Sequence, residues 1–368
     1  MNAQPGSRLK GDVLLIGSMP SEDVEQIFRA AGTILRGHAG CLPDGEVGVR
    51  KNWVGMLPVL VFSSHPSLEE VRRPPPGGLE QPEHDENAPP VEEIEGTWTF
   101  RVKPGAELRF DDLKYAGFAK QSYEIFRRLR DEGAIEGGAR FQLCLPAPNS
   151  AINAFFEEPE QWPAVQRAYM DRLRGEIADV LQTIPADDLA VQFDLAWEVV
   201  DLAMGERNYF RFWPRSTREE KLERHTSWLE DLSRSVPDEA LLGFHWCYGT
   251  WGGWPMTAMA DLALCVQLSN AAVRRSTRRV DYVHMPVVRD PDEAFFEPLR
   301  NLETGDTKVF LGLIHESDIE GFPRRLELAR GYLPNFGVAG VCGYGRLDPH
   351  ELPAVLDAHA AAATALNA

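Results

Sequence analysis

Eight short apolar runs, each followed by a longer amphipathic stretch, constrain the fold of this chain more than any other feature. Alternation of this kind is typical of parallel strands joined by helices. Nothing resembles the glycine-rich turn of a dinucleotide-binding sheet, so we expect a closed α/β barrel of the (β/α)8, or TIM, type. The predicted strands are residues 13–17, 57–62, 141–145, 189–194, 241–246, 280–284, 309–314 and 338–342.

The barrel is expected to form one domain over residues 1–368, interrupted by an insertion at residues 73–110. Residues 73–96 are rich in Pro, Gly and acidic side chains, which favours a loop. Segments 97–102 and 107–110 flank Pro104-Gly105 and predict a β-hairpin. We interpret the insertion as a solvated loop, with a lid over the barrel mouth or a dimer arm as the alternatives.

Two helices have clear sequence signals. Asp348 is expected to cap a helix that closes the barrel, because Pro349 and Glu351 follow it and apolar residues recur at helical spacing. The predicted buried face of that helix carries Leu352, Val355, Leu356 and His359. Residues 256–269 show the same spacing, and we interpret the methionines there, Met256 and Met259, as core residues.

Charge excludes some classes of partner. The 368 residues include 38 basic and 56 acidic side chains, a formal net charge of −18. A surface of this sign repels nucleic acid and anionic membranes. No apolar run approaches the roughly 20 residues that a membrane span needs, and the first residues lack a signal-peptide pattern, so we expect a cytoplasmic protein. The sequence indicates no oligomer interface.

The strongest chemical signal is Gly243-Phe-His-Trp-Cys-Tyr-Gly249 at the end of the fifth run. Residues two apart on a strand point to the same side, so His245 and Cys247 can present a nitrogen and a sulfur to one point. Such donors suit zinc, which in catalytic sites keeps a position for water or substrate. Alone, the pair is weak evidence for a metal.

Other candidate ligands fall at the ends of other predicted strands. Cys342 ends the eighth run, His284 ends the sixth, and His315 and Glu316 follow the seventh. Because all strands of a parallel barrel end on one face, these distant residues can meet there. Each also has a structural interpretation, since Cys342 can be a buried thiol and His284 a core histidine bonded to a carbonyl.

The remaining cysteines and two carboxylates differ in their expected roles. We interpret Cys144 and Cys265 as ordinary buried thiols, while Cys41 is left undecided. Asp194 ends the fourth run among apolar residues, where an acid needs a partner such as a cationic substrate group. Glu46 lies on a glycine-containing loop, where a solvated turn is the alternative. The backbone N–H groups of residues 16–18, Ile-Gly-Ser, can bind a carboxylate.

Taken in order, these motifs resemble the catalytic barrel of cobalamin-independent methionine synthase, within the broader group that contains uroporphyrinogen decarboxylase. The family's Ile-Gly-Ser-Phe-Pro is similar to residues 16–20, Ile-Gly-Ser-Met-Pro. Its Gly-Glu segment, which Arg-Asn and an aromatic residue follow, is similar to Gly45-Glu46 with Asn52-Trp53. Its Gln-Ile-Asp-Glu-Pro resembles residues 192–196, Gln-Phe-Asp-Leu-Ala. Its His-x-Cys-Tyr and late Cys-Gly match residues 245–248 and 342–343.

The resemblance implies zinc bound by His245, Cys247 and Cys342, with methyl transfer to a small amino-acid thiol such as homocysteine. It implies that Ile16, Gly17, Ser18, Glu46 and Asp194 bind this substrate. The family's fourth ligand is a Glu at the end of the sixth strand, where this chain offers His284, with Glu316 as the alternative. His315 is expected to shuttle a proton or to support the site, and Asp194 to assist catalysis.

Two other functions stay open at this stage. A lyase or decarboxylase on the same barrel would use the carboxylates and His315 without zinc. A non-catalytic protein that binds zinc or a thiol would have four protein ligands and no exchangeable position. The departure of residues 194–196, Asp-Leu-Ala, from the family's Asp-Glu-Pro leaves the substrate itself undecided.

Overall fold

The computed structural model describes residues 8–74, 98–210, 212–250 and 254–368. Its central feature is an eight-stranded parallel sheet. The strands are β1 (Val13–Leu14), β2 (Cys41–Pro43), β5 (Arg140–Pro146), β6 (Leu189–Leu195), β7 (Leu241–Trp246), β8 (Tyr282–Pro286), β9 (Lys308–Ile314) and β10 (Gly337–Gly340).

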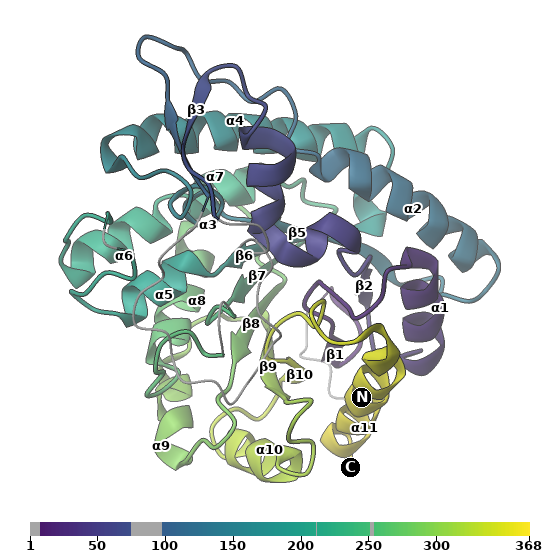
Figure 1. The fold of residues 1–368 in the computed structure, drawn as a ribbon. Coiled ribbons are helices and arrows are strands. Elements are labelled where there is room, and N and C mark those ends of the chain that lie inside the picture. Colours follow the sequence, from purple (N-terminus) through teal and green to yellow (C-terminus); the bar gives the residue numbers. More distant parts are fainter. Residues whose placement is uncertain (1–7, 75–97, 211, 251–253) are drawn as a thin grey trace.

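The strands follow the order β1-β10-β9-β8-β7-β6-β5-β2 and curl into a nearly closed barrel (Figure 1). At the seam, parallel bridges join Val13 to Ala39 and Ser18 to Gly45. The expected α/β barrel is thus confirmed. All strands run the same way, so residues far apart in sequence converge at their carboxyl ends.

Helices surround the sheet on its outside. They are α1 (Val24–Ile34), α2 (Tyr115–Asp131), α3 (Pro148–Ile152), α4 (Trp162–Leu181), α5 (Trp197–Ala203), α6 (Arg218–Thr226), α7 (Leu229–Arg234), α8 (Ala263–Arg275), α9 (Glu293–Phe296), α10 (Phe322–Arg330) and α11 (Leu352–Leu366). None of the helices in the described ranges is both long and apolar enough to cross a membrane.

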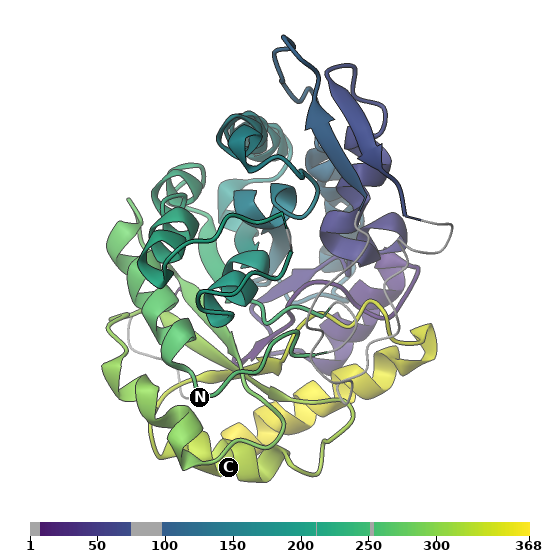
Figure 2. The same ribbon diagram turned by 60° about the vertical axis from the view of Figure 1, so that its left-hand side comes forward.

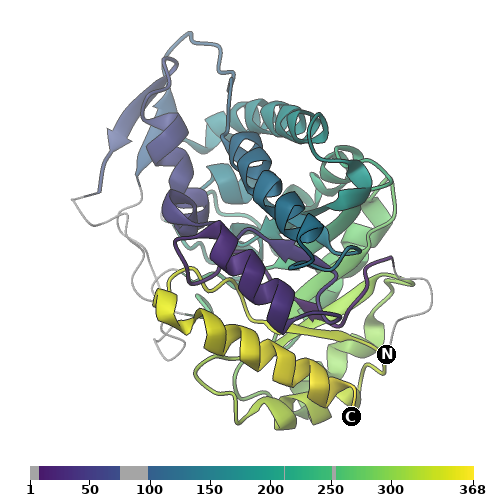
Figure 3. The same cartoon turned by 90° about the vertical axis from the view of Figure 1, so that its right-hand side faces the viewer.

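The last helix confirms its sequence signals. The Asp348 carboxylate accepts a hydrogen bond from the His350 backbone N–H in the turn that precedes α11. The predicted face of α11 is buried. Helix α11 lies beside α1, so the two ends of the barrel sequence pack together (Figure 3).

Two predicted elements near the N-terminal half are wrong. The run 57–62 is helical over Pro58–Phe62 rather than a strand, and the second barrel strand is instead β2. Proline at the first helical position fits the start of a helix, and a short apolar run does not distinguish a strand from a buried helix. The interpretation of Cys41 is thereby settled, because it is a buried strand residue.

The predicted hairpin also has a different partner. Strand β4 (Thr99–Val102) pairs antiparallel with β3 (Leu68–Arg72), not with residues 107–110. This two-stranded unit projects from the barrel (Figure 2). Residues 75–96 of the predicted loop lie outside the described residues, so its interpretation as a solvated loop, with a lid or a dimer arm as alternatives, stays a prediction.

The helix predicted for residues 256–269 begins later, at Ala263. Asp261 accepts a hydrogen bond from the Ala263 backbone N–H just before the first turn of α8. Met256 therefore lies in a loop, where it is buried at a cavity wall, and Cys265 lies buried in the helix.

Candidate active site

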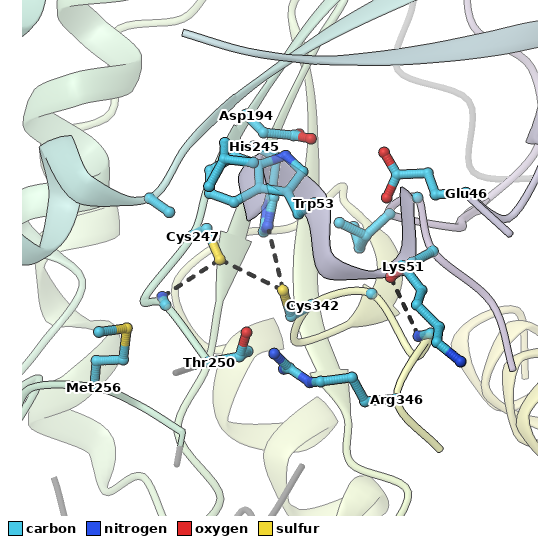
Figure 4. Close-up of a pocket in the computed structure, with 18 of the residues that line it drawn as sticks. Glu46, Lys51, Trp53, Asp194, His245, Cys247, Thr250, Met256, Cys342 and Arg346 are labelled. Atoms are coloured by element: carbon cyan, nitrogen blue, oxygen red, sulfur yellow. Dashed lines mark hydrogen bonds between the residues drawn. The ribbon is translucent and has the colours of Figure 1, made fainter. Parts of the chain in front are cut away.

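Three predicted metal ligands meet at the carboxyl end of the barrel. Ligand atoms of His245, Cys247 and Cys342 all lie within 4.8 Å of one another. His245 and Cys247 come from β7 and the residue that follows it, and Cys342 comes from the loop after β10 (Figure 4). The convergence follows from parallel strand ends that share one face.

The donor set fits a zinc ion. Zinc–sulfur bonds of about 2.3 Å in a tetrahedron separate two sulfur ligands by about 3.8 Å, and a sulfur from a nitrogen by about 3.6 Å. Cys247 Sγ lies 3.4 Å from Cys342 Sγ, which lies 3.9 Å from His245 Nε2. Small side-chain movements would bring the three atoms into zinc-binding geometry.

His284, expected as the fourth ligand, lies outside this cluster. Its Nδ1 is 2.7 Å from His245 Nδ1, so one imidazole donates a hydrogen bond to the other. Burial lowers the pKa of His284 well below its usual value, and His245 adds to this effect. A neutral His284 can thus orient His245 with its Nε2 toward the sulfurs.

The two thiols form a hydrogen bond with each other. The hydrogen bond between them lowers the pKa of Cys342 well below its usual value and raises that of Cys247, with burial also raising the latter. Of the two thiols, Cys342 is therefore the one that ionises more readily. A thiolate is the species that binds a metal ion.

The cluster lines a cavity of about 80 Å³. Every residue predicted to bind the substrate contributes to its wall, from β6 and from the loops after β1 and β2. The predicted residues among its lining are Ile16, Gly17, Ser18, Glu46 and Asp194, and the others include Lys51, Trp53, Trp197, Thr250, Met256 and Arg346.

Two buried carboxyl groups in this cavity have raised pKa values. Burial raises the pKa of Glu46 to about 8, with Arg50 lowering it and Asp44 and Cys342 raising it. Burial, followed by the nearby Glu46 charge, also raises the pKa of Asp194 well above its usual range. An ammonium group placed between them would reverse both effects.

The loops after β1 and β10 are held together beside the cluster. The backbone N–H of Tyr344 donates to Ser18 O at 2.7 Å, and that of Gly345 donates to Ser18 Oγ at 3.2 Å. A Cβ at Gly343 would lie 2.2 Å from Ser18 Oγ, so only glycine permits this approach. Cys342 is thereby fixed against the Ile-Gly-Ser loop.

His315 and Glu316, the other residues expected near the site, are outside the described cavity lining. His315 is buried, with Nε2 2.9 Å from Val287 O and its ring against Trp254. Glu316 lies near Arg346. Burial lowers the pKa of Arg346, and the charges of Cys342, Cys247 and Glu316 partly offset this effect.

The sequence interpretation missed Trp53 and Arg346. The Trp53 side chain faces Asp194, and its backbone adopts φ +49°, which is rare for a residue other than glycine (Figure 4). Arg346 follows Cys342 by four residues, and Figure 4 places it across the sulfurs from Asp194. For Trp53 the available signal was the match of Asn52-Trp53 to the family's segment, and for Arg346 it was proximity to the Cys342-Gly motif.

Comparison with solved structures identifies the class of barrel. Two solved structures, one of a B12-independent enzyme and one of a protein assigned to the same type, match nearly the full chain. No family model and no curated protein sequence matches it.

The particular fold is that of methionine synthase. A B12-independent methionine synthase from Shewanella sp. W3-18-1, in complex with selenomethionine, has a TM-score of 0.59 at 13% identity and covers 97% of this chain and 98% of its own. A protein from Listeria monocytogenes assigned as a vitamin-B12-independent methionine synthase has a TM-score of 0.53 at 12% identity, covering 93% and 85%. The likeness establishes a methionine-synthase-like barrel fold.

Proposed function

We propose that this protein is a zinc-dependent methyltransferase that methylates the thiol of a small amino acid such as homocysteine. One observation carries the proposal: a His/Cys/Cys cluster shares the wall of one cavity with the carboxylates Glu46 and Asp194. The selenomethionine bound by the Shewanella enzyme, a methionine analogue, supports the same ligand class.

His245, Cys247 and Cys342 would hold the zinc. When bound, zinc would supply Lewis acidity that keeps an acceptor sulfur as a nucleophilic thiolate at neutral pH. Three protein ligands are typical of catalytic zinc sites, whereas structural sites have four. The geometry thus favours an exchangeable position over the closed site of a storage or binding protein.

The chain's own residues would bind and orient the amino acid. Glu46 and Asp194 would accept the ammonium group, and Trp53 and Trp197 would exclude water from the reacting sulfur. His284 would keep the His245 Nε2 lone pair directed at the metal through the contact between their Nδ1 atoms.

Metal content and acceptor specificity test the proposal together. We expect one zinc per purified chain and methylation of homocysteine when methylfolate or methylcobalamin is supplied. Cys342→Ala should lose zinc and activity together, while Cys265→Ala, a buried thiol in α8, should keep both. A metal-free wild-type protein with lyase or decarboxylase activity would refute the proposal.

A further inference from the structure

A layer of buried polar side chains lies directly beneath the cavity. Register places Gln192 on β6, Gly243 on β7 and Tyr282 on β8 side by side. Two residues further along these strands are Asp194, His245 and His284, which also lie side by side. Gln192 and Tyr282 are 0% exposed. Alternation along a strand therefore stacks this polar layer under the candidate site.

Gln192 joins two walls of the cavity. Its Nε2 donates hydrogen bonds to Asp194 Oδ1 at 2.8 Å and to the backbone carbonyl of Ile16 at 2.6 Å. Asp194 lies on β6 and Ile16 in the loop after β1, and these two strands are not neighbours in the sheet. One amide group thus sets the distance between the carboxylate and the first-strand loop.

The orientation of this amide is fixed from below. Gln192 Oε1 accepts from Gln142 Nε2 and from the Tyr282 hydroxyl, both at 3.3 Å. Gln142 is itself fixed, since its Nε2 donates to Leu15 O at 2.8 Å and its Oε1 accepts from Cys41 Sγ at 2.9 Å. A reversed Gln192 amide would place its oxygen against a carboxylate and a carbonyl, which repel it.

Glycine at position 243 makes this arrangement possible. A Cβ there would lie 2.1 Å from the Tyr282 ring. The Tyr282 ring therefore lies over Gly243 on β7. This position lets the Tyr282 hydroxyl reach across β7 to Gln192 on β6. The glycine of the Gly-Phe-His-Trp-Cys segment therefore supports the site as well as the strand.

We propose that Gln192 is a positioning residue that holds one oxygen of Asp194, so that the carboxylate is aimed at the ammonium group of the bound amino acid. This inference rests on the proposed function. It separates roles within the site, because Asp194 contacts the ligand and Gln192 acts only through Asp194 and the Ile16 loop. Loss of Gln192 should impair ligands that carry an amino group and spare those that lack one.

Calorimetric titration of the full chain with two probes tests this inference. L-Methionine carries the ammonium group, and 4-(methylthio)butanoate is the same thioether acid without it. Gln192→Met keeps the length of the side chain and removes its N–H donors. We expect this variant to bind methionine about ten- to a hundredfold more weakly, because a hydrogen bond to a charged group is lost. Its affinity for 4-(methylthio)butanoate should be unchanged.

A double-mutant cycle shows whether Gln192 acts through Asp194. In an Asp194→Asn background, Gln192→Met should weaken methionine binding by no more than about twofold. Tyr282→Phe, which removes one bond that orients the amide, should give a smaller selective loss and serves if Gln192→Met fails to fold. Ser269→Ala, which removes a buried bond to Trp246 Nε1 at 2.7 Å, is the control for general destabilisation.

The outcomes separate the two proposals. Equal loss of both probes in Gln192→Met, or full additivity with Asp194→Asn, would show a purely structural role and overturn the inference. Binding of methionine by the wild type, undiminished by Gln192→Met, would overturn it while leaving the proposed function standing. A wild type that binds neither thioether nor homocysteine would overturn the proposed function, and the inference with it.

Discussion

Ligand binding should be strongly pH-dependent because of Glu46. Burial raises the pKa of Glu46 to about 8, so its carboxyl group is mostly protonated in the free protein at pH 7. An ammonium group binds the carboxylate form, and its arrival stabilises the charge. Binding should therefore release a proton, and affinity should rise with pH.

The size of the effect follows from the titration. With a pKa of about 8, about one tenth of the protein has Glu46 ionised at pH 7, about one hundredth at pH 6 and about one half at pH 8. If only the ionised form binds well, methionine affinity should rise about fiftyfold between pH 6 and pH 8. At pH 7, about 0.9 proton should be released from Glu46 per ligand bound.

Calorimetry in two buffers of different ionisation enthalpy measures both quantities. Glu46→Gln is the matched variant, since it keeps the shape of the side chain and cannot titrate. It should bind methionine about as well as the wild type at pH 6, fall behind at pH 8 and release no proton from this group. A wild-type affinity that stays constant from pH 6 to pH 8 would refute the role assigned to Glu46.

Three further changes test packing and buried charge by urea unfolding. Gly243→Ala should destabilise the fold by about 1–3 kcal/mol, because its Cβ would overlap the Tyr282 ring, and an unchanged midpoint would contradict that packing. Asp201→Asn should lower the free energy of unfolding by about 3–5 kcal/mol, because the buried Lys221 would lose its counter-charge. Lys221 Nζ is 0% exposed and lies 2.7 Å from Asp201 Oδ1. A decrease below about 1 kcal/mol would argue against this ion pair. Burial lowers the pKa of His359 to about 4, so between about pH 6.5 and pH 4 the unfolded chain binds a proton that the folded chain does not. Stability should fall as the pH decreases through that window, and His359→Leu should flatten the slope; equal slopes in both proteins would count against this explanation.

The barrel could be predicted from the sequence because most of its strands are long enough to be recognised. Strands β5 through β9 are five to seven residues long and mostly apolar, and β7 was predicted residue for residue. Strand β2 has only three residues and ends in Pro43, so its pattern was too short to detect. Pro58–Phe62, apolar throughout, carried the signal of a strand although it is helical.

The convergence of His245, Cys247 and Cys342 was also predictable, since it needs only the parallel direction of the strands. The cavity lining was harder, because Trp53 and Arg346 lie on irregular loops whose paths depend on tertiary contacts. Arg346 is placed by the contacts of its loop with Ser18, more than 300 residues earlier in the chain. No periodic pattern encodes such a contact.

The position of His284 depends on a single step of strand register. His284 pairs directly with His245, in the same layer, whereas Cys247 lies two residues beyond His245 in the layer above. Because side chains alternate along β8, Pro286 is the residue that faces the barrel interior in that upper layer. The side chain of proline has no atom that can bind a metal ion. A metal held by Cys247 and Cys342 can therefore receive a fourth protein ligand from β8 only if the strand shifts. Without that shift, β8 would leave the fourth position of the proposed zinc open to the ligand, and His284 would act on the metal only through its contact with His245. Pro286→Glu tests the argument, because a carboxylate in the upper layer should raise zinc affinity and weaken thiol binding. Unchanged values for both would show that β8 does not face the metal.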